Sequence, residues 1–313
     1  MSLAAGGAIT VALLSAGVMG MAIQRGATCM VAAVDEAIVA RRYGRAAALA
    51  EAALWVGGLV ALIELAGSMA APAAAYPVGA LTIAGGVLLG LGAWINQACV
   101  FGAVARIGSG QWAYLATPVG FYLGCLAPFP GPIAAAENAP LAHAWPLALL
   151  FVPLLGWRIV EATRAPDAVR HLWHPHRATL LIAITFVTAM LTVGSWAYTD
   201  ALAALAHDKD ARLGLRGAMV VALLGGAIAG GLIGGAIRAR AIRVIAVLRC
   251  LTGGAVMGLG GMIVPGGNDG LIMIGLPLLR PYAWVAVTTM TATIAAAIGL
   301  AGAGKRAAAM VIH

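Results

Sequence analysis

Long apolar segments alternate with short polar loops along the whole chain. Segments of about 20 apolar residues match the roughly 30 Å hydrocarbon core of a bilayer when they form α-helices. The pattern predicts nine membrane-spanning helices, near residues 3–23, 46–67, 76–93, 111–129, 145–160, 178–198, 214–237, 245–262 and 281–303. The first segment lacks a basic start and a small-residue cleavage site, so we expect a retained helix rather than a signal peptide.

Three further apolar stretches are too short to cross a bilayer. They cover residues 28–40, 94–105 and 267–279, and each follows a glycine-rich or polar break. Short helices after a break are typical of the interrupted helices of transporters. We therefore expect an all-α polytopic membrane protein with about nine transmembrane helices and short re-entrant half-helices.

Positive charge is concentrated in the loops at 41–45, 158–177 and 238–243, with Lys305 and Arg306 near the end of the sequence. Lys and Arg are enriched in cytoplasmic loops, so we expect a multi-pass protein of a bacterial inner (cytoplasmic) membrane, with a periplasmic N-terminus and a cytoplasmic C-terminus. The composition agrees, because 62% of the residues are hydrophobic, 10% are charged and the mean hydropathy is +0.97. The net charge of +8 indicates topology rather than nucleic-acid binding.

Two segments 168 positions apart have similar sequences, GVLLGLGAWINQACVFGAVARIGSG at 86–110 and GAVMGLGGMIVPGGNDGLIMIGLPL at 254–278. The first is entered from an uncharged loop and the second from the arginine-rich loop at 238–243, so the copies are predicted to be inverted. The alternative, that glycine-rich spans resemble each other by composition alone, stays open. We expect one membrane domain, 1–313, made of a first repeat (1–130), a connecting helix and basic loop (131–177) and a second repeat (178–313).

Polar residues and glycines occur at the two similar breaks. They are Asn96 and Gln97 in the first copy and Gly266, Gly267 and Asn268 in the second. The start of a half-helix presents unpaired backbone N–H groups and the positive end of the helix dipole. We therefore predict that the two breaks form a binding site for a small anion. The side-chain amides of Asn96, Gln97 and Asn268 supply further, neutral hydrogen-bond donors to this site.

Two of the four cysteines, Cys29 and Cys99, lie at breaks that precede half-helices. A thiol at a helix N-terminus is biased toward thiolate and is polarizable, which suits a ligand that itself contains sulfur. The alternative is that each is a small buried hydrophobe, as most free cysteines are. We assign that role to Cys125 and Cys250, because the four cysteines are too scattered for a disulfide framework or a zinc site.

Three charged residues flank the breaks. Arg25 and Arg106 either attract an anion or anchor the chain at the interface. Asp269 either carries a proton at membrane depth or caps a half-helix that begins near Gly270, and we favour the cap.

The sequence resembles the YeeE/YedE sulfur-transport family, which includes thiosulfate importers and SoxT-like proteins. The likeness rests on GMAIQRGATC at 20–29, GLGAWINQACVFGAVARIGSG at 90–110 and GGAVMGLGGMIVPGGNDG at 253–270. It implies an hourglass-like fold of inverted repeats, in which thiols at a central constriction pass thiosulfate on by S–H to sulfur contacts. Two of the three family cysteines match Cys29 and Cys99, and the third position is Gly267 here.

These observations predict an importer of a sulfur-containing anion, and thiosulfate is the anion that we expect. A SoxT-like membrane sensor that binds sulfur compounds without net transport is the alternative, and a channel for another anion is a third reading. A cytoplasmic sulfur-accepting or regulatory protein is a candidate partner, and we expect no nucleic acid, cofactor or metal. The sequence has no nucleotide-binding loop and no catalytic triad, so we do not expect an enzyme.

Overall fold

The computed structural model describes residues 3–26, 28–67, 74–128, 144–164, 173, 177–194, 196–207, 213–238 and 241–311. These residues form helices and no strands, which confirms the all-α prediction. Within them, seven helical segments are long and apolar enough to cross a membrane: Gly6–Val39, Gly44–Leu65, Ala80–Gly108, Ala178–His207, Gly214–Ile233, Val244–Ile263 and Pro281–Gly302. The protein is therefore a multi-pass helical membrane protein.

Two of the nine predicted spans are not among these seven segments. The span near 111–129 becomes a 3₁₀ turn, η1 (Trp112–Leu115), and a ten-residue helix, α6 (Ala116–Cys125). Ten residues rise only about 15 Å, half the thickness of the hydrocarbon core. The span near 145–160 becomes α7 (Ala144–Arg164), which contains Pro153 and ends in charged residues. The count of nine is therefore not confirmed.

Interrupted helices occur along most of the chain. The pairs on either side of a short break are α1 (Leu3–Gly26) and α2 (Met30–Val39), α4 (Ala80–Asn96) and α5 (Val100–Gly108), α9 (Ala178–Val193) and α10 (Tyr198–His207), and α12 (Val244–Ile263) and α13 (Gly267–Gly270). A π-helical turn, η2 (Leu271–Gly275), follows α13. Helices α2 and α5 fall where short helices were predicted, at 28–40 and 94–105.

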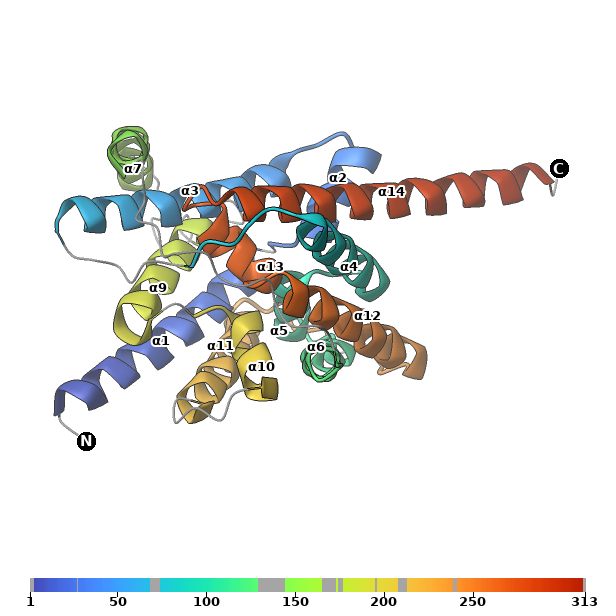
Figure 1. The fold of residues 1–313 in the computed structure, drawn as a ribbon, viewed down its shortest axis with the longest axis horizontal. Helices are drawn as coiled ribbons and strands as arrows, with labels where there is room; N and C mark the ends of the chain where they lie inside the picture. Colours follow the sequence, from blue (N-terminus) through green and yellow to red (C-terminus); the bar gives the residue numbers. More distant parts are fainter. Residues whose placement is uncertain are drawn as a thin grey trace.

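The remaining long helices are α3 (Gly44–Leu65), α11 (Leu213–Ile233) and α14 (Pro281–Val311). Helix α1 packs against α9 and α11, while α12 packs against α4 and α6. Helix α3 packs against α7 and α9, and α14 packs against α4. In Figure 1 the interrupted helices lie in the middle, α7 stands at the edge, and α14 extends past the other helices to the C-terminus.

Helices α4 and α12 cross closely because both present glycine at the contact. A methyl group on Gly92 would lie 2.6 Å from the backbone N of Met257, and one on Gly253 would lie 2.6 Å from the backbone N of Asn96. Small residues at a crossing let two backbones approach, and van der Waals contact then holds helices together in lipid. This crossing fixes the end of α4, where the first similar break begins.

We expect Gly92→Ala to lower the free energy of unfolding by about 1–3 kcal/mol, because its methyl group has no space between α4 and α12. Thermal unfolding in detergent measures the effect. Gly217→Ala in α11 is the matched control, because a methyl group there meets no atom within 4 Å. Equal melting temperatures for the two variants would show that the crossing tolerates a side chain.

Candidate functional site

Cys29 and Cys99 are the N-cap residues of the helices that follow the first two breaks. Cys29 precedes α2 and Cys99 precedes α5, and both have extended backbones. The Cys29 carbonyl accepts a hydrogen bond from the amide of Ala33, and the Cys99 carbonyl accepts one from the amide of Ala103, both at 2.9 Å. Each thiol therefore lies beside the free amides at the start of a helix.

The two thiols lie close together, although they are 70 positions apart in the sequence. They are near enough to interact electrostatically. The backbone amide of Met30, the first residue of α2, donates to the Cys99 Sγ at 3.2 Å. Cys99 is fully buried and Cys29 is 5% exposed. The starts of α2 and α5 and the sulfur atoms of Cys29 and Cys99 therefore lie together at one buried position, which we call the thiol point.

Gly102 in α5 forms part of the wall around this point. A methyl group there would overlap the Cys29 Sγ and approach the Cys29 Cβ. A side chain at this position would push α2 away from α5, so the absence of one lets the two thiols meet.

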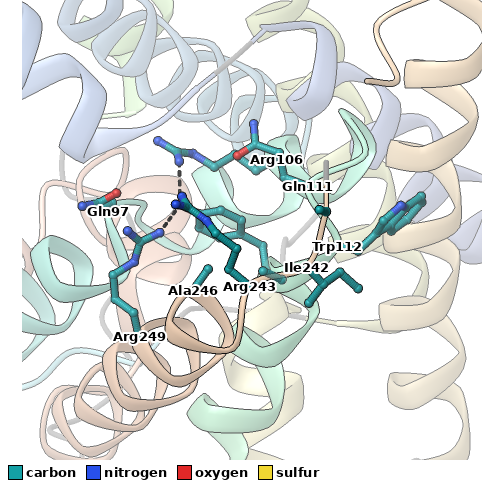
Figure 2. Close-up of a pocket in the computed structure, with 11 residues that line it drawn as sticks. Gln97, Arg106, Gln111, Trp112, Ile242, Arg243, Ala246 and Arg249 are labelled. Atoms are coloured by element: carbon teal, nitrogen blue, oxygen red, sulfur yellow. Dashed lines mark hydrogen bonds between the residues drawn. The ribbon is translucent and has the colours of Figure 1, made fainter. Parts of the chain in front are cut away.

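Asn96 and Gln97, both predicted to bind the anion, have different surroundings. The Asn96 side chain is fully buried; its Nδ2 donates to the Ala98 carbonyl at 2.8 Å, and its Oδ1 accepts from the Thr117 hydroxyl at 3.0 Å. Gln97 is exposed, has a left-handed backbone (φ +61°) and lines a cavity with Arg106 (Figure 2). Asn96 therefore stabilises the conformation of the break between α4 and α5, whereas Gln97 faces the cavity.

The two candidate arginines lie in different surroundings. Arg25 stacks on Trp173, with its guanidinium carbon 5.0 Å from the ring centroid, as an anchoring residue does. Arg106 donates to the Tyr114 hydroxyl at 2.5 Å, lies over the Tyr114 ring, and is close enough to Cys29 to interact with it electrostatically. Of the two, Arg106 is the one placed to act on an anion at the thiols.

The second similar break is followed by a carboxyl group, that of Asp269, two residues after the position that corresponds to Cys99. Asp269 is 3% exposed and accepts hydrogen bonds from the Thr199 amide, at 3.2 Å, and from the Thr199 hydroxyl. Thr199 belongs to the first turn of α10, so Asp269 caps that helix. The prediction that Asp269 caps a helix beginning near Gly270 is therefore wrong, because α13 already begins at Gly267 and contains Asp269.

Gly267 and Asn268 at this break are also buried. Gly266 and Gly267 both have positive φ, and a side chain on Gly267 would collide with Thr199. The amide group of Asn268 is buried and makes no hydrogen bond within the described part of the chain. Thr199 was missed in the sequence, because nothing local marks a contact with a residue 70 positions away.

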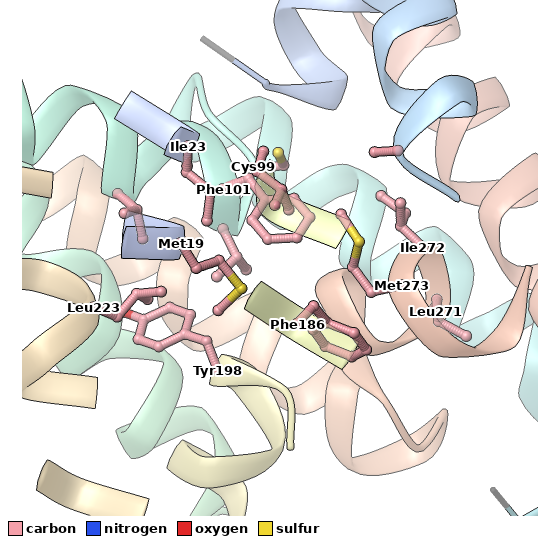
Figure 3. Close-up of a cluster of buried hydrophobic side chains, with 14 of the residues drawn as sticks. Met19, Ile23, Cys99, Phe101, Phe186, Tyr198, Leu223, Leu271, Ile272 and Met273 are labelled. Atoms are coloured by element: carbon pink, nitrogen blue, oxygen red, sulfur yellow. The ribbon is translucent and has the colours of Figure 1, made fainter. Parts of the chain in front are cut away.

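An apolar cluster lies between the thiols and Asp269. Figure 3 shows Met19 and Phe101 between Cys99 and Tyr198, with Met273 and Phe186 on the other side of the cluster. A cavity of only about 10 Å³, close to the size needed by one water molecule, is lined by Phe101, Met273 and Asp269. Helix α13 packs against α5, so the two breaks are neighbours that apolar side chains separate.

The chain matches a family model described as sulphur transport over residues 25–296. The chain belongs to this sulphur transport family. The matched range contains all four breaks, and the resemblance inferred from the sequence is confirmed. Family membership and the seven apolar segments indicate membrane transport of sulfur compounds.

One curated relative is the thiosulfate transporter TsuA of Escherichia coli (strain K12). It is 24% identical over 324 aligned residues, which cover 89% of this chain and 90% of the relative. The similarity therefore extends over nearly the whole membrane domain rather than over the break motifs alone.

We expect Asn96→Ala to lower the free energy of unfolding by about 1–3 kcal/mol, because it leaves the buried Ala98 carbonyl and Thr117 hydroxyl unpaired. Chemical or thermal unfolding in detergent measures this loss. Gln97→Gly is the matched control, because glycine accepts the left-handed backbone and the exposed side chain supports no buried bond. An Asn96→Ala protein as stable as Gln97→Gly would contradict the structural role of Asn96.

Proposed function

We propose that the protein imports a small sulfur-containing anion, thiosulfate, across the bacterial inner membrane. Membership of the sulphur transport family and the TsuA relative support the substrate class. The observation that carries the mechanism is the hydrogen bond from the Met30 amide to the Cys99 Sγ, with the Cys29 thiol alongside. It joins the start of one half-helix to the thiol at the start of another.

This arrangement suits an anion with a sulfur end and an oxygen end. The thiols of Cys29 and Cys99 donate weak S–H hydrogen bonds to the terminal sulfur of thiosulfate. In this proposal the amides at the starts of α2 and α5, one of which bonds the Cys99 sulfur in the closed structure, turn to the oxyanion end, because the helix dipoles favour negative charge there. Every donor is neutral and no covalent bond forms, so the anion can leave without a chemical step.

The thiol point is closed in this structure, because both thiols are buried. Transport requires that it opens first to one side of the membrane and then to the other. We propose that movement between two inverted halves supplies this opening, as in transporters built from inverted repeats. In this proposal α2 and α5 are the re-entrant half-helices of the first half, and the ranges 1–130 and 178–313 are the two repeats.

The packing partners support this division. Helix α1 packs on α11 as α9 packs on α3, and α4 packs on α14 as α12 packs on α6. At the offset of 168 found in the sequence, Cys29 corresponds to Ala197 and Cys99 to Gly267, and both counterparts lie at helix breaks. From the positive charge of the arginine-rich loops we propose that the N-terminus is periplasmic and the C-terminus is cytoplasmic.

The residue at the position of the third family cysteine supports a second candidate function. Gly267 has no thiol, and the Thr199 hydroxyl occupies the space that a side chain there would need. A path with two thiols instead of three suits a SoxT-like sensor, which binds the anion and signals to a cytoplasmic protein without flux. Uptake experiments separate the two functions.

We expect Cys99→Ala and Cys29→Ala each to lower thiosulfate uptake at least tenfold, because each removes one of the two thiols that contact the anion. Uptake of labelled thiosulfate by cells without other importers measures this loss. Cys125→Ala is the matched control, since Cys125 is a buried thiol whose Sγ bonds the Gly258 carbonyl, at 3.7 Å, and lies at neither break.

Two results would contradict the transport proposal. Uptake that survives removal of both Cys29 and Cys99 indicates a channel in which the thiols are incidental. Thiosulfate-dependent gene control without uptake by the unaltered protein indicates a sensor.

We expect Gly267→Cys alone to destabilise the protein, because φ is +49° there and Thr199 blocks the new side chain. Combining it with Thr199→Ala removes the block and is expected to recover part of the melting temperature. A Gly267→Cys protein as stable as the unaltered chain would show that the second break rearranges freely.

A further inference from the structure

A cavity of about 400 Å³ lies beside the thiol point and is strongly basic. Its walls come from the end of α4, the segment between α5 and α6, and the start of α12. Figure 2 shows Arg106, Arg243 and Arg249 gathered at this cavity, with Gln97 and Trp112 on its walls. The volume lies in the range of small-molecule sites, roughly 300–1,000 Å³.

Tyr114 positions two of the three arginines, Arg106 and Arg249. Its side chain is 3% exposed, and its hydroxyl accepts hydrogen bonds from Arg106 at 2.5 Å and from Arg249 at 3.3 Å. The Nε of Arg249 is buried and makes no hydrogen bond within the described residues. Two guanidinium groups are thus held in place while donors remain available.

The positive charge of the cavity is not balanced. No acidic residue lines it, and no ion pair joins Arg106, Arg243 or Arg249 to a carboxylate within the described part of the chain. Like charges that share a cavity repel, so this arrangement is favourable when an anion occupies it. Guanidinium groups match tetrahedral oxyanions, because their N–H groups bond two oxygens at once.

The cavity adjoins the thiol point. Gln97 lines the cavity and lies two residues before Cys99, and Arg106 belongs to the same helix that Cys99 caps. Arg106 also acts electrostatically on Cys29. An anion that leaves the thiols on this side therefore meets Gln97 and Arg106 first.

We propose that this cavity is a second anion-binding site, which holds the transported sulfur oxyanion on the arginine-rich side of the membrane. The inference rests on the proposed transport function and names the next site on its path. Arg243 and Arg249 bind the oxyanion directly. Arg106 attracts the oxyanion both in the cavity and at the thiol point. Tyr114 positions Arg106 and Arg249. The cavity is larger than a bare oxyanion needs, so the anion is bound with part of its water shell.

Binding of sulfate tests the second site separately from the thiols. Sulfate has the oxyanion geometry and charge of thiosulfate but no terminal sulfur. The test protein carries Cys29→Ala and Cys99→Ala, is embedded in phosphatidylcholine nanodiscs, and is titrated with sulfate in a calorimeter at constant ionic strength. We expect saturable binding that Arg249→Gln and Arg243→Gln each weaken about tenfold or more.

Arg42→Gln is the matched control, because Arg42 is an exposed arginine of another basic loop and does not line the cavity. It removes the same charge and is expected to leave sulfate binding unchanged. Arg243 is exposed at the N-cap of α12, so its replacement does not disturb the buried core. Equal melting temperatures confirm that each variant is folded.

Two outcomes overturn the second site. Sulfate affinity that is unchanged in both Arg243→Gln and Arg249→Gln removes the arginines from anion binding, even if thiosulfate uptake still depends on Cys99. Loss of sulfate binding when phosphatidylglycerol is added to the nanodiscs assigns the cavity to a lipid headgroup instead. Sulfate binding that follows the arginines, in a protein that does not take up thiosulfate, supports the site and contradicts the transport function alone.

Discussion

A backbone amide inside a bilayer must find a partner within the protein, because no water is available to it. Each interrupted helix exposes such amides at the start of its second segment, and the partners they find determine the chemistry of the molecule. At the start of α2, the Met30 amide bonds the sulfur of Cys99. At the start of α10, the Thr199 amide bonds the carboxylate of Asp269.

These two partners differ in strength. A thiol sulfur is a weak acceptor, whereas the oxygen atoms of a carboxyl group accept stronger hydrogen bonds. The start of α10 is therefore already occupied by an acidic group of the chain, and Asp200 in the same helix adds a second carboxyl nearby. The start of α2 keeps a partner that an external anion can displace. This difference explains why we place substrate binding at the thiols and not equally at both breaks.

The sequence predicted the parts of the site that local pattern encodes. Breaks, short helices and cysteines at helix starts are visible as residue types at fixed positions, so Cys29 and Cys99 were identified as a pair. Contacts between distant segments were not predictable. The sequence does not indicate that Thr199 packs against Gly267. It also does not indicate that the Asn96 amide is hydrogen-bonded to Ala98 and Thr117. Nor does it indicate that the Tyr114 hydroxyl accepts a hydrogen bond from Arg249, 135 positions away. The count of spans failed for a local reason, since apolar composition near 111–129 does not reveal that α6 stops after ten residues.

The order of neutral and charged donors along the proposed path has a physical reason. A cation in direct contact with an anion at the buried thiols would hold it very strongly, because charges interact with little screening at low dielectric. Arg106 acts on the thiols only electrostatically, since its guanidinium group is bonded to the Tyr114 hydroxyl. Neutral S–H and amide donors at that point bind the anion without trapping it. The three arginines lie in a larger cavity, where water weakens each interaction and lets the anion leave. Gln97 is exposed, lies two residues before Cys99 and lines the same cavity as Arg106, so it carries a neutral amide close to both environments. The proposed path therefore leads from neutral donors at the thiols, past a neutral amide, to charged donors in the cavity.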